Sequence, residues 1–183
     1  VPTNVANKII NQAIRKVNVL VGDDVSAALG FVSELTIPSN IVEIGDDLLK
    51  GNGKLKKLVL SIGDTCVVGK RAFSGTGINE IVIPGSMQVV SNELFKACTQ
   101  LEKVVFKEGV RVIQDSAFYG CIGLKSIEFP STLEQVGYSF IHCPKLTKVE
   151  VPSTAQIGEE RNGKTLPAFD KGVEVKRVDY TTD

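Results

Sequence analysis

Residues 101–123, LEKVVFKEGVRVIQDSAFYGCIG, decide the fold, because their pattern of apolar residues recurs along most of the chain. The pattern opens L-x-x-L-x-L. Its first apolar residue recurs at intervals of 23, 23, 23, 23 and 22 residues, at Val32, Leu55, Ile78, Leu101, Leu124 and Leu146. A period of this length indicates a solenoid, since one unit cannot bury its apolar face without its neighbours.

Each opening predicts a strand. The apolar residues would point into the core and the residues between them toward solvent, because side chains alternate along a strand. A proline follows the strand in four units, at Pro38, Pro84, Pro130 and Pro152. Proline ends the ladder because it has no N–H to donate. The stacked units therefore predict a parallel sheet along one face.

The rest of each unit adds further inward residues and then a dipeptide that ends in a bulky side chain. The inward residues are Ile41, Met87, Val110 and Leu133, followed by Ile44, Val67, Val90, Ile113 and Val136. The dipeptides end at Leu49, Phe73, Phe95, Phe118 and Phe140, and Phe169 looks like a displaced last copy. With Phe106 and Phe129 in the strands, seven of the eight Phe are predicted to form a core.

The combined pattern, L-x-x-I-x-I-P-x-x-V-x-x-I-G-x-x-A-F-x-x-C-x-x, resembles the BspA-like (Treponema pallidum type) leucine-rich repeat. The clearest copies are residues 101–123 and LKSIEFPSTLEQVGYSFIHC at 124–143. Unit two departs from the pattern, with Asp64 at an apolar position and one extra residue before Phe73. The resemblance implies an α/β repeat fold, and a surface or secreted protein used for adhesion or protein binding. It supplies no catalytic residue.

We expect one leucine-rich-repeat domain over 1–183, with a parallel sheet on one face and short helical or irregular segments opposite. Residues 32–157 would form about six full repeats of 22–23 residues. Residues 1–31 would hold a helix, with apolar residues at Val5, Ile9, Ala13, Ile14 and Val17, and a degenerate first repeat in which Val21 corresponds to Ile44. Residues 158–183 would form an irregular cap, because the ends of a solenoid must cover its core.

Composition disfavours nucleic acid and membranes as partners. The 21 Lys and Arg balance the 21 Asp and Glu, so no net field gathers phosphates or anionic lipid. The apolar runs fall well short of the roughly 20 residues that span a bilayer, so direct membrane insertion is not expected. We expect a monomer or part of a longer repeat array, located at the cell surface or secreted.

Residues 158–165, GEERNGKT, satisfy the phosphate-loop pattern G-x-x-x-x-G-K-T. That loop works between a strand and a helix, whose N-terminus faces the phosphates. Here Leu166 and Pro167 follow at once and the chain soon ends, so we favour a polar loop within the cap. Nucleotide binding at 158–165 remains the alternative function.

Cysteines and acids offer the other candidate chemistry. Cys98, Cys121 and Cys143 share one repeat position, and His142 is the only histidine, so buried free thiols are favoured over disulfides or zinc.

Asp23, Asp46 and Asp64 could gather calcium between turns, but capping of the short turns that follow is favoured. His142 is interpreted as a surface residue. We expect no catalytic site, no cofactor and no metal.

The exposed face of the sheet is the predicted binding site. At the third repeat position, charges alternate in sign, which predicts cross-strand ion pairs. At the fifth position, three valines form an apolar stripe. The predicted site comprises Lys57, Val59, Glu80, Val82, Lys103, Val105 and Glu128.

Two explanations of this face stay open. Valine suits any strand, and alternating charges avoid repulsion between stacked positions. An apolar centre with a charged rim also suits a protein partner, such as a host surface or matrix protein. Carbohydrate binding is a further alternative, with little support on a face without Trp.

Overall fold

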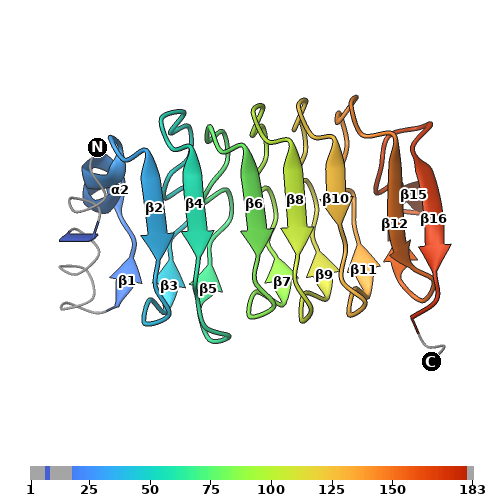
Figure 1. Cartoon of the computed structure of the whole chain (residues 1–183), viewed down its shortest axis with the longest axis horizontal. Helices are drawn as coiled ribbons and strands as arrows, with labels where there is room; N and C mark the ends of the chain where they lie inside the picture. Colours follow the sequence, from blue (N-terminus) through green and yellow to red (C-terminus); the bar gives the residue numbers. More distant parts are fainter. Residues whose placement is uncertain (1–6, 9–17, 181–183) are drawn as a thin grey trace.

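The computed structural model describes residues 7–8 and 18–180 of the chain. Within 18–180 the repeats stack along one axis, from the N-terminal end to the C-terminal end (Figure 1). A helix was expected from the apolar residues Val5, Ile9, Ala13, Ile14 and Val17. All five lie outside the described residues.

The predicted strands form one row of parallel strands. They are β2 (Glu34–Ile37), β4 (Lys57–Leu60), β6 (Glu80–Ile83), β8 (Lys103–Phe106), β10 (Ser126–Glu128) and β12 (Lys148–Pro152). Where strands pair, each residue faces the same repeat position of the next unit, as Glu34 faces Lys57 and Glu80 faces Lys103. The leucine-rich-repeat solenoid is therefore confirmed.

A second row of two-residue strands runs beside the first, where helical or irregular segments were expected. These strands are β1 (Val19–Leu20), β3 (Glu43–Ile44), β5 (Val67–Val68), β7 (Val89–Val90), β9 (Val112–Ile113), β11 (Gln135–Val136) and β13 (Gln156–Ile157). Within residues 18–180 there is one α-helix, α2 (Asp23–Leu29). The β-branched residues of these segments favour extended backbone over helix.

The core contains a stack of phenyl rings, one from each turn that follows the short strands. Neighbouring rings from Phe73 to Phe95, Phe118, Phe140 and Phe169 lie nearly parallel, with centroids 5.6, 5.3, 5.1 and 5.5 Å apart. The seven predicted core Phe are all buried, whereas Phe31 is exposed. Burying a side chain of this size contributes about 1.5–3 kcal/mol. The aromatic core is confirmed, with Phe169 as its last copy.

Two register predictions are wrong by one residue. Val67 is 65% exposed, and Val68 is the residue that pairs with Ile44. Leu20, which is fully buried, also pairs with Ile44, whereas Val21 is exposed. In both units one more residue than the usual period separates the paired positions. In unit two this extra residue lies in the loop between β4 and β5, where Ile62 is buried and Asp64 is exposed.

Residues 158–180 contain regular structure, in contrast to the irregular cap expected for 158–183. β14 (Glu159–Arg161) and β15 (Lys164–Leu166) pair antiparallel as a hairpin. Its turn residues Asn162 and Gly163 have φ of 52° and 75°, which suits the two-residue hairpin turn that favours Asn-Gly. β16 (Glu174–Val178) then pairs in parallel with β12, as a separate two-stranded sheet that continues the row of long strands.

Both rows of strands break at the boundary between repeats two and three. β4 does not pair with β6, and β5 does not pair with β7, although the repeats remain neighbours (Figure 1). Across intact boundaries, the Ser61 and Lys107 N–H groups donate to the preceding strand at 2.9 Å. The equivalent residue at this boundary is Pro84, which has no N–H. Proline alone does not break the row, because Pro130 holds the same position where β8 and β10 remain paired. At this boundary Pro84 coincides with the longer loop of repeat two, and the long strands also separate between β10 and β12.

The turns hold the two parts of the solenoid together across this boundary. The Phe73 N–H donates to the Leu94 carbonyl at 3.1 Å, and the Gly75 N–H donates to the Lys96 carbonyl at 2.8 Å. The chain then passes so close to repeat one that a Cβ on Gly77 would lie 2.4 Å from the Gly53 carbonyl oxygen. The core therefore stays continuous while both rows of strands separate.

Candidate functional site on the exposed sheet face

The structure brings the seven predicted site residues to the solvent side of the long strands. The alternation along β4 and β6 buries Leu58 and Ile81 and exposes the residues on either side of each. Val59 and Val82 are 38% and 49% exposed, and Val105 is half-buried. The stripe of valines at the fifth position is thus present and accessible to a partner, most of all at β4 and β6.

The charges on this face do not pair as predicted. Within residues 18–180, no ion pair joins Glu34 to Lys57, Lys57 to Glu80, or Glu80 to Lys103. Instead Lys103 reaches diagonally to Glu128, with Nζ and Oε1 3.8 Å apart. An ion pair between long, exposed side chains contributes little free energy in water. Two such residues that face each other on adjacent strands therefore need not form an ion pair. Lys57 and Glu80 are left without an ion pair on the described surface.

The break between β4 and β6 opens a groove of about 700 Å³ on this face. Side chains of both strands line it, and Val59 and Val82 supply its exposed apolar surface. Its volume lies within the roughly 300–1,000 Å³ that is usual for ligand pockets. The repeat pattern did not predict this groove. The signals that could have found it were the extra residue of unit two and the proline at 84.

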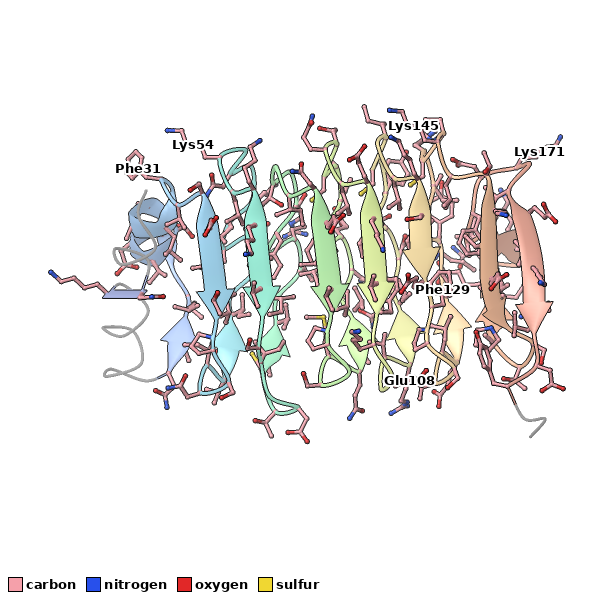
Figure 2. The ribbon with its side chains drawn as sticks, in the orientation of Figure 1. Phe31, Lys54, Glu108, Phe129, Lys145 and Lys171 are labelled. Carbon is pink, nitrogen blue, oxygen red and sulfur yellow. The ribbon has the colours of Figure 1, made fainter. Side chains whose placement is uncertain are left out.

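Basic residues lie at both ends of the groove. Lys56 and Lys57 stand at the start of β4, and Lys107 stands just after the end of β8. Side-chain alternation places Lys107 on the same face as Lys103 and Val105. The groove therefore has an apolar centre between two basic ends. Figure 2 shows the side chains on this face and at both ends of the strands.

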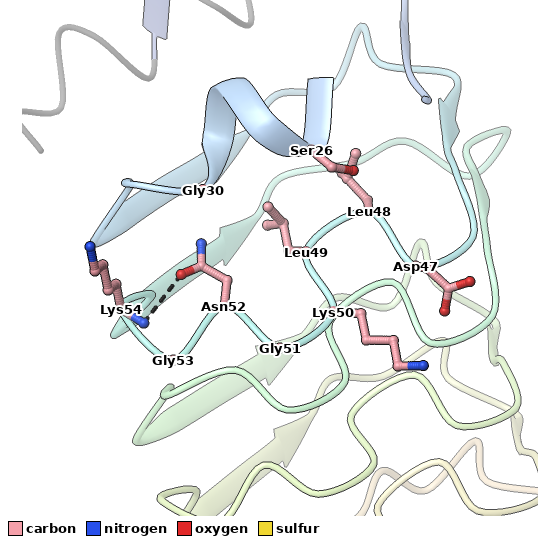
Figure 3. Close-up of a pocket in the computed structure, with 10 residues that line it drawn as sticks. All are labelled: Ser26, Gly30, Asp47, Leu48, Leu49, Lys50, Gly51, Asn52, Gly53 and Lys54. Carbon is pink, nitrogen blue, oxygen red and sulfur yellow. Dashed lines mark hydrogen bonds between the residues drawn. The ribbon is translucent and has the colours of Figure 1, made fainter. Parts of the chain in front are cut away.

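A second pocket, of about 410 Å³, lies between α2 and residues 47–54 (Figure 3). The Leu49 side chain turns toward α2, whereas the Lys50 side chain turns away from it. The Asn52 amide oxygen accepts the Lys54 backbone N–H at 3.2 Å. The Asn52 amide nitrogen donates to the Leu29 carbonyl at 3.3 Å, and Arg71 of the next repeat donates to the Asp47 carboxylate at 2.7 Å. These polar groups are already engaged within the chain, so the pocket offers fewer converging side chains than the groove.

The phosphate-loop interpretation of residues 158–165 is wrong. Glu159–Arg161 and Lys164–Leu166 pair with each other as β14 and β15, and no helix follows them up to residue 180. The Thr165 hydroxyl donates to the Glu160 carboxylate, and the Arg161 guanidinium donates to Asp115 at 2.6 Å. A cradle of N–H groups leading into a helix N-terminus is not formed, so nucleotide binding through this motif is not proposed.

The cysteine ladder is a structural feature of the core. Cys98, Cys121 and Cys143 are buried, and each Sγ lies 3.3 or 3.4 Å from a carbonyl oxygen of the preceding repeat. Burial raises the pKa of all three thiols, to about 12 for Cys143. The prediction of buried free thiols is confirmed.

The acids near the turns support the structure in a different way from the one predicted. Asp46 Oδ1 accepts the Lys70 backbone N–H of the next repeat at 2.8 Å, and α2 has no side-chain cap. Among residues 7–8 and 18–180, no cluster of three or more His, Cys, Asp or Glu is arranged to hold a metal. No helix in the described part is long and apolar enough to cross a membrane.

Several solved structures share this fold. A leucine-rich repeat protein from Eubacterium ventriosum is 22% identical with a TM-score of 0.56, over 82% of this chain and 45% of that one. The pneumococcal vaccine antigen PcpA is 16% identical with a TM-score of 0.45, over 70% of this chain and 47% of that one. A leucine-rich cell surface protein from Faecalibacterium prausnitzii is 15% identical with a TM-score of 0.31, over 82% of this chain and 61% of that one. The chain spans just under half the length of the first two.

No curated protein matches the chain. The model of the family described as BspA type leucine rich repeat region (6 copies) matches residues 66–161, just over half of the chain. The match covers repeats that the structure shows stacked in register, with their phenyl rings and thiols in ladders. The chain belongs to the BspA-type leucine-rich repeat family.

Proposed function

We propose that this domain is a non-enzymatic protein-binding or adhesion module that acts at the cell surface or in secreted form. The observation that carries the proposal is the groove between β4 and β6, where Val59 and Val82 are exposed at the centre of the sheet face. Family resemblance supports the location, and solenoids commonly bind partners through an extended face. Lys57, Glu80, Lys103, Val105 and Glu128 would surround the contact.

Apolar and charged groups on this face are arranged as an apolar centre with a charged rim. Covering exposed valine stabilises a complex by about 25 cal/mol for each Å² of apolar surface removed from water. Charged side chains around the valines remain hydrated at the rim, as they do in protein interfaces. Free lysine and glutamate side chains on this rim can choose among partners by charge complementarity.

The size of the face sets the expected strength. Six strands about 4.8 Å apart, each exposing about five residues at about 3.3 Å, give about 460 Å². A stable interface takes about 800 Å² from each partner. The domain alone would therefore bind a host surface or matrix protein weakly, and several such contacts in a longer array would bind more tightly.

The test compares the wild-type chain with Val82→Lys on an array of purified human matrix proteins and cell-surface ectodomains. The matched control is Val67→Lys, because Val67 is 65% exposed but lies in the row of short strands. We expect saturable binding to at least one arrayed protein, lost in Val82→Lys and kept in Val67→Lys. Equal binding by all three proteins would remove the sheet face as the site.

A further inference from the structure

We infer that the groove between β4 and β6 binds an extended acidic segment of a partner protein, with two carboxylates four residues apart and an apolar residue midway between them. This inference rests on the proposed function and specifies the chemistry of the partner.

The charges of the groove favour an acidic ligand. Lys56, Lys57 and Lys107 line it, and within residues 18–180 none of them forms an ion pair. Two carboxylates also line the groove, but Glu102 is held by Lys125 at 3.0 Å. Only Glu80 remains free to oppose an acidic ligand. Three unpaired lysines against one unpaired glutamate leave the groove locally positive, although the whole chain is neutral.

The spacing of the lysines suits an extended backbone. Lys57 occupies the third repeat position on β4 and Lys107 the seventh, just after β8, so they are four residues apart along the strand direction, or roughly 13 Å at about 3.3 Å per residue. They also lie two strands apart across the sheet, or roughly 10 Å at about 4.8 Å per strand. In an extended segment, residues i, i+2 and i+4 point to the same side and cover the same length. A segment that crosses β6 obliquely with the pattern acid-x-apolar-x-acid therefore presents its three side chains to Lys57, the valines and Lys107, and the long lysine and glutamate side chains span the remaining separation.

The apolar centre argues against small anions and sugars as the main ligand. Val59 and Val82 lie between the basic ends, and Pro84 adds apolar surface beside Lys107. A phosphate or sulfate would use one lysine and leave the valines in contact with water. A peptide that covers the valines removes that surface from water while its carboxylates meet the lysines, so it uses all parts of the groove.

The test is an NMR titration of the whole isotope-labelled chain with the peptide acetyl-Ser-Glu-Thr-Val-Thr-Glu-Ser-amide. We expect saturable shifts of the backbone amides of Val59 and Val82. One control peptide carries Gln in place of both Glu, and a second has its Glu residues three positions apart. Each control should bind about five-fold more weakly, since exposed ion pairs contribute about 0.2–1 kcal/mol each.

Protein variants check the position of the peptide. Lys107→Glu should weaken binding about five-fold, whereas Lys145→Glu, an equal charge change on an exposed loop outside the groove, should leave it unchanged. Glu80→Gln should strengthen binding about two-fold by removing the free carboxylate. Inorganic phosphate at equal ionic strength should produce no saturable shift of Val59 or Val82.

The inference is overturned if the shifts do not saturate, if the Gln peptide binds as well as the Glu peptide, or if Lys107→Glu and Lys145→Glu behave alike. The proposed function would still stand after such a result if a protein of the array binds the wild-type chain but not Val82→Lys. Conversely, an array partner that binds Val82→Lys normally removes the sheet face as its site, whether or not the peptide binds.

Discussion

The carboxylate of Asp170 accepts the backbone N–H of Cys143 at 2.8 Å, and its other oxygen accepts the His142 N–H at 2.9 Å. In the preceding repeat Gly120 holds the position of His142, and the Gly120 N–H donates to the backbone carbonyl of Ile141 at 2.8 Å. Asp170 therefore replaces a backbone acceptor that a following repeat would supply. It closes the row of turns at the C-terminal end of the stack.

Replacing Asp170 should destabilise the solenoid. Asp170→Ala leaves two N–H groups without their acceptor, and hydrogen bonds to charged groups contribute about 1.5–3 kcal/mol. We expect the free energy of unfolding to fall by about that amount in urea denaturation, and by less in Asp170→Asn, which keeps one acceptor oxygen. Asp64→Ala, at an exposed aspartate, is the control. Equal losses in Asp170→Ala and Asp64→Ala would contradict the capping role.

The buried thiols should be unreactive in the folded chain. Burial raises the pKa of Cys143 to about 12, and Cys98 and Cys121 are also raised, so few thiolates form near neutral pH. A chromogenic disulfide reagent at pH 8 should react first with Cys66, which is only half-buried. The other three should react only at the rate of unfolding. Rapid reaction of four thiols would contradict this assignment.

These thiols also predict a loss of stability in alkali. A raised pKa in the folded state means that the unfolded chain releases the Cys143 proton first, starting near the ordinary value of about 8.5. The free energy of unfolding should therefore fall as pH rises from there toward about 12. Cys143→Ala should flatten this part of the pH profile, whereas Cys66→Ala should change it less, because Cys66 is less buried.

Two equivalent turn residues have a left-handed backbone conformation. Substitutions at these two positions should have opposite effects on the free energy of unfolding. Gly120 has φ of 74°, and the corresponding residue one repeat earlier, Ala97, has φ of 58°. A Cβ on Gly120 would meet nothing closer than 3.9 Å, so Gly120→Ala tests backbone strain alone. It should lower the free energy of unfolding by about 1 kcal/mol, because the left-handed conformation costs other residues about 1–2 kcal/mol.

Ala97→Gly should instead raise the free energy of unfolding or leave it unchanged, because relief of strain is opposed by the entropy that glycine loses on folding. Ala27→Gly in α2 is the matched control, since a right-handed helical residue gains nothing from glycine and should lose about 1 kcal/mol. Thermal or urea unfolding separates these outcomes. A larger loss in Ala97→Gly than in Ala27→Gly would contradict the assigned conformation.

Glu108 should titrate below its usual range. The Ser131 hydroxyl and the Ser131 backbone N–H donate to its carboxylate at 2.7 and 2.9 Å, and these bonds lower the pKa of Glu108. NMR titration should show this low pKa rising in Ser131→Ala, which removes the hydroxyl. The bonds stabilise the folded state above the ordinary pKa of glutamate, and that contribution is lost as pH falls through the lowered value.

The repeat pattern was enough to predict the long strands, the Phe core and the cysteine ladder, because stacked identical positions can be buried only in a common register. The predicted pairing was wrong at Val67 and Val21, where a unit is one residue longer than the usual period. The period shows that a residue is inserted but not where in the unit it lies. The predicted valines do share one face. Their flanking charges do not pair as predicted, because side chains in water are not fixed by the backbone register.

The sequence by itself therefore determined a BspA-type solenoid with Val59, Val82 and Val105 on its exposed sheet. Its period and side-chain alternation depend only on local geometry and on burial between adjacent repeats. Only the tertiary structure decided that the strands of repeats two and three separate, that a groove lies there, and that Lys57 and Lys107 form no ion pair within residues 18–180. These features depend on hydrogen bonds between repeats that a one-dimensional period does not contain.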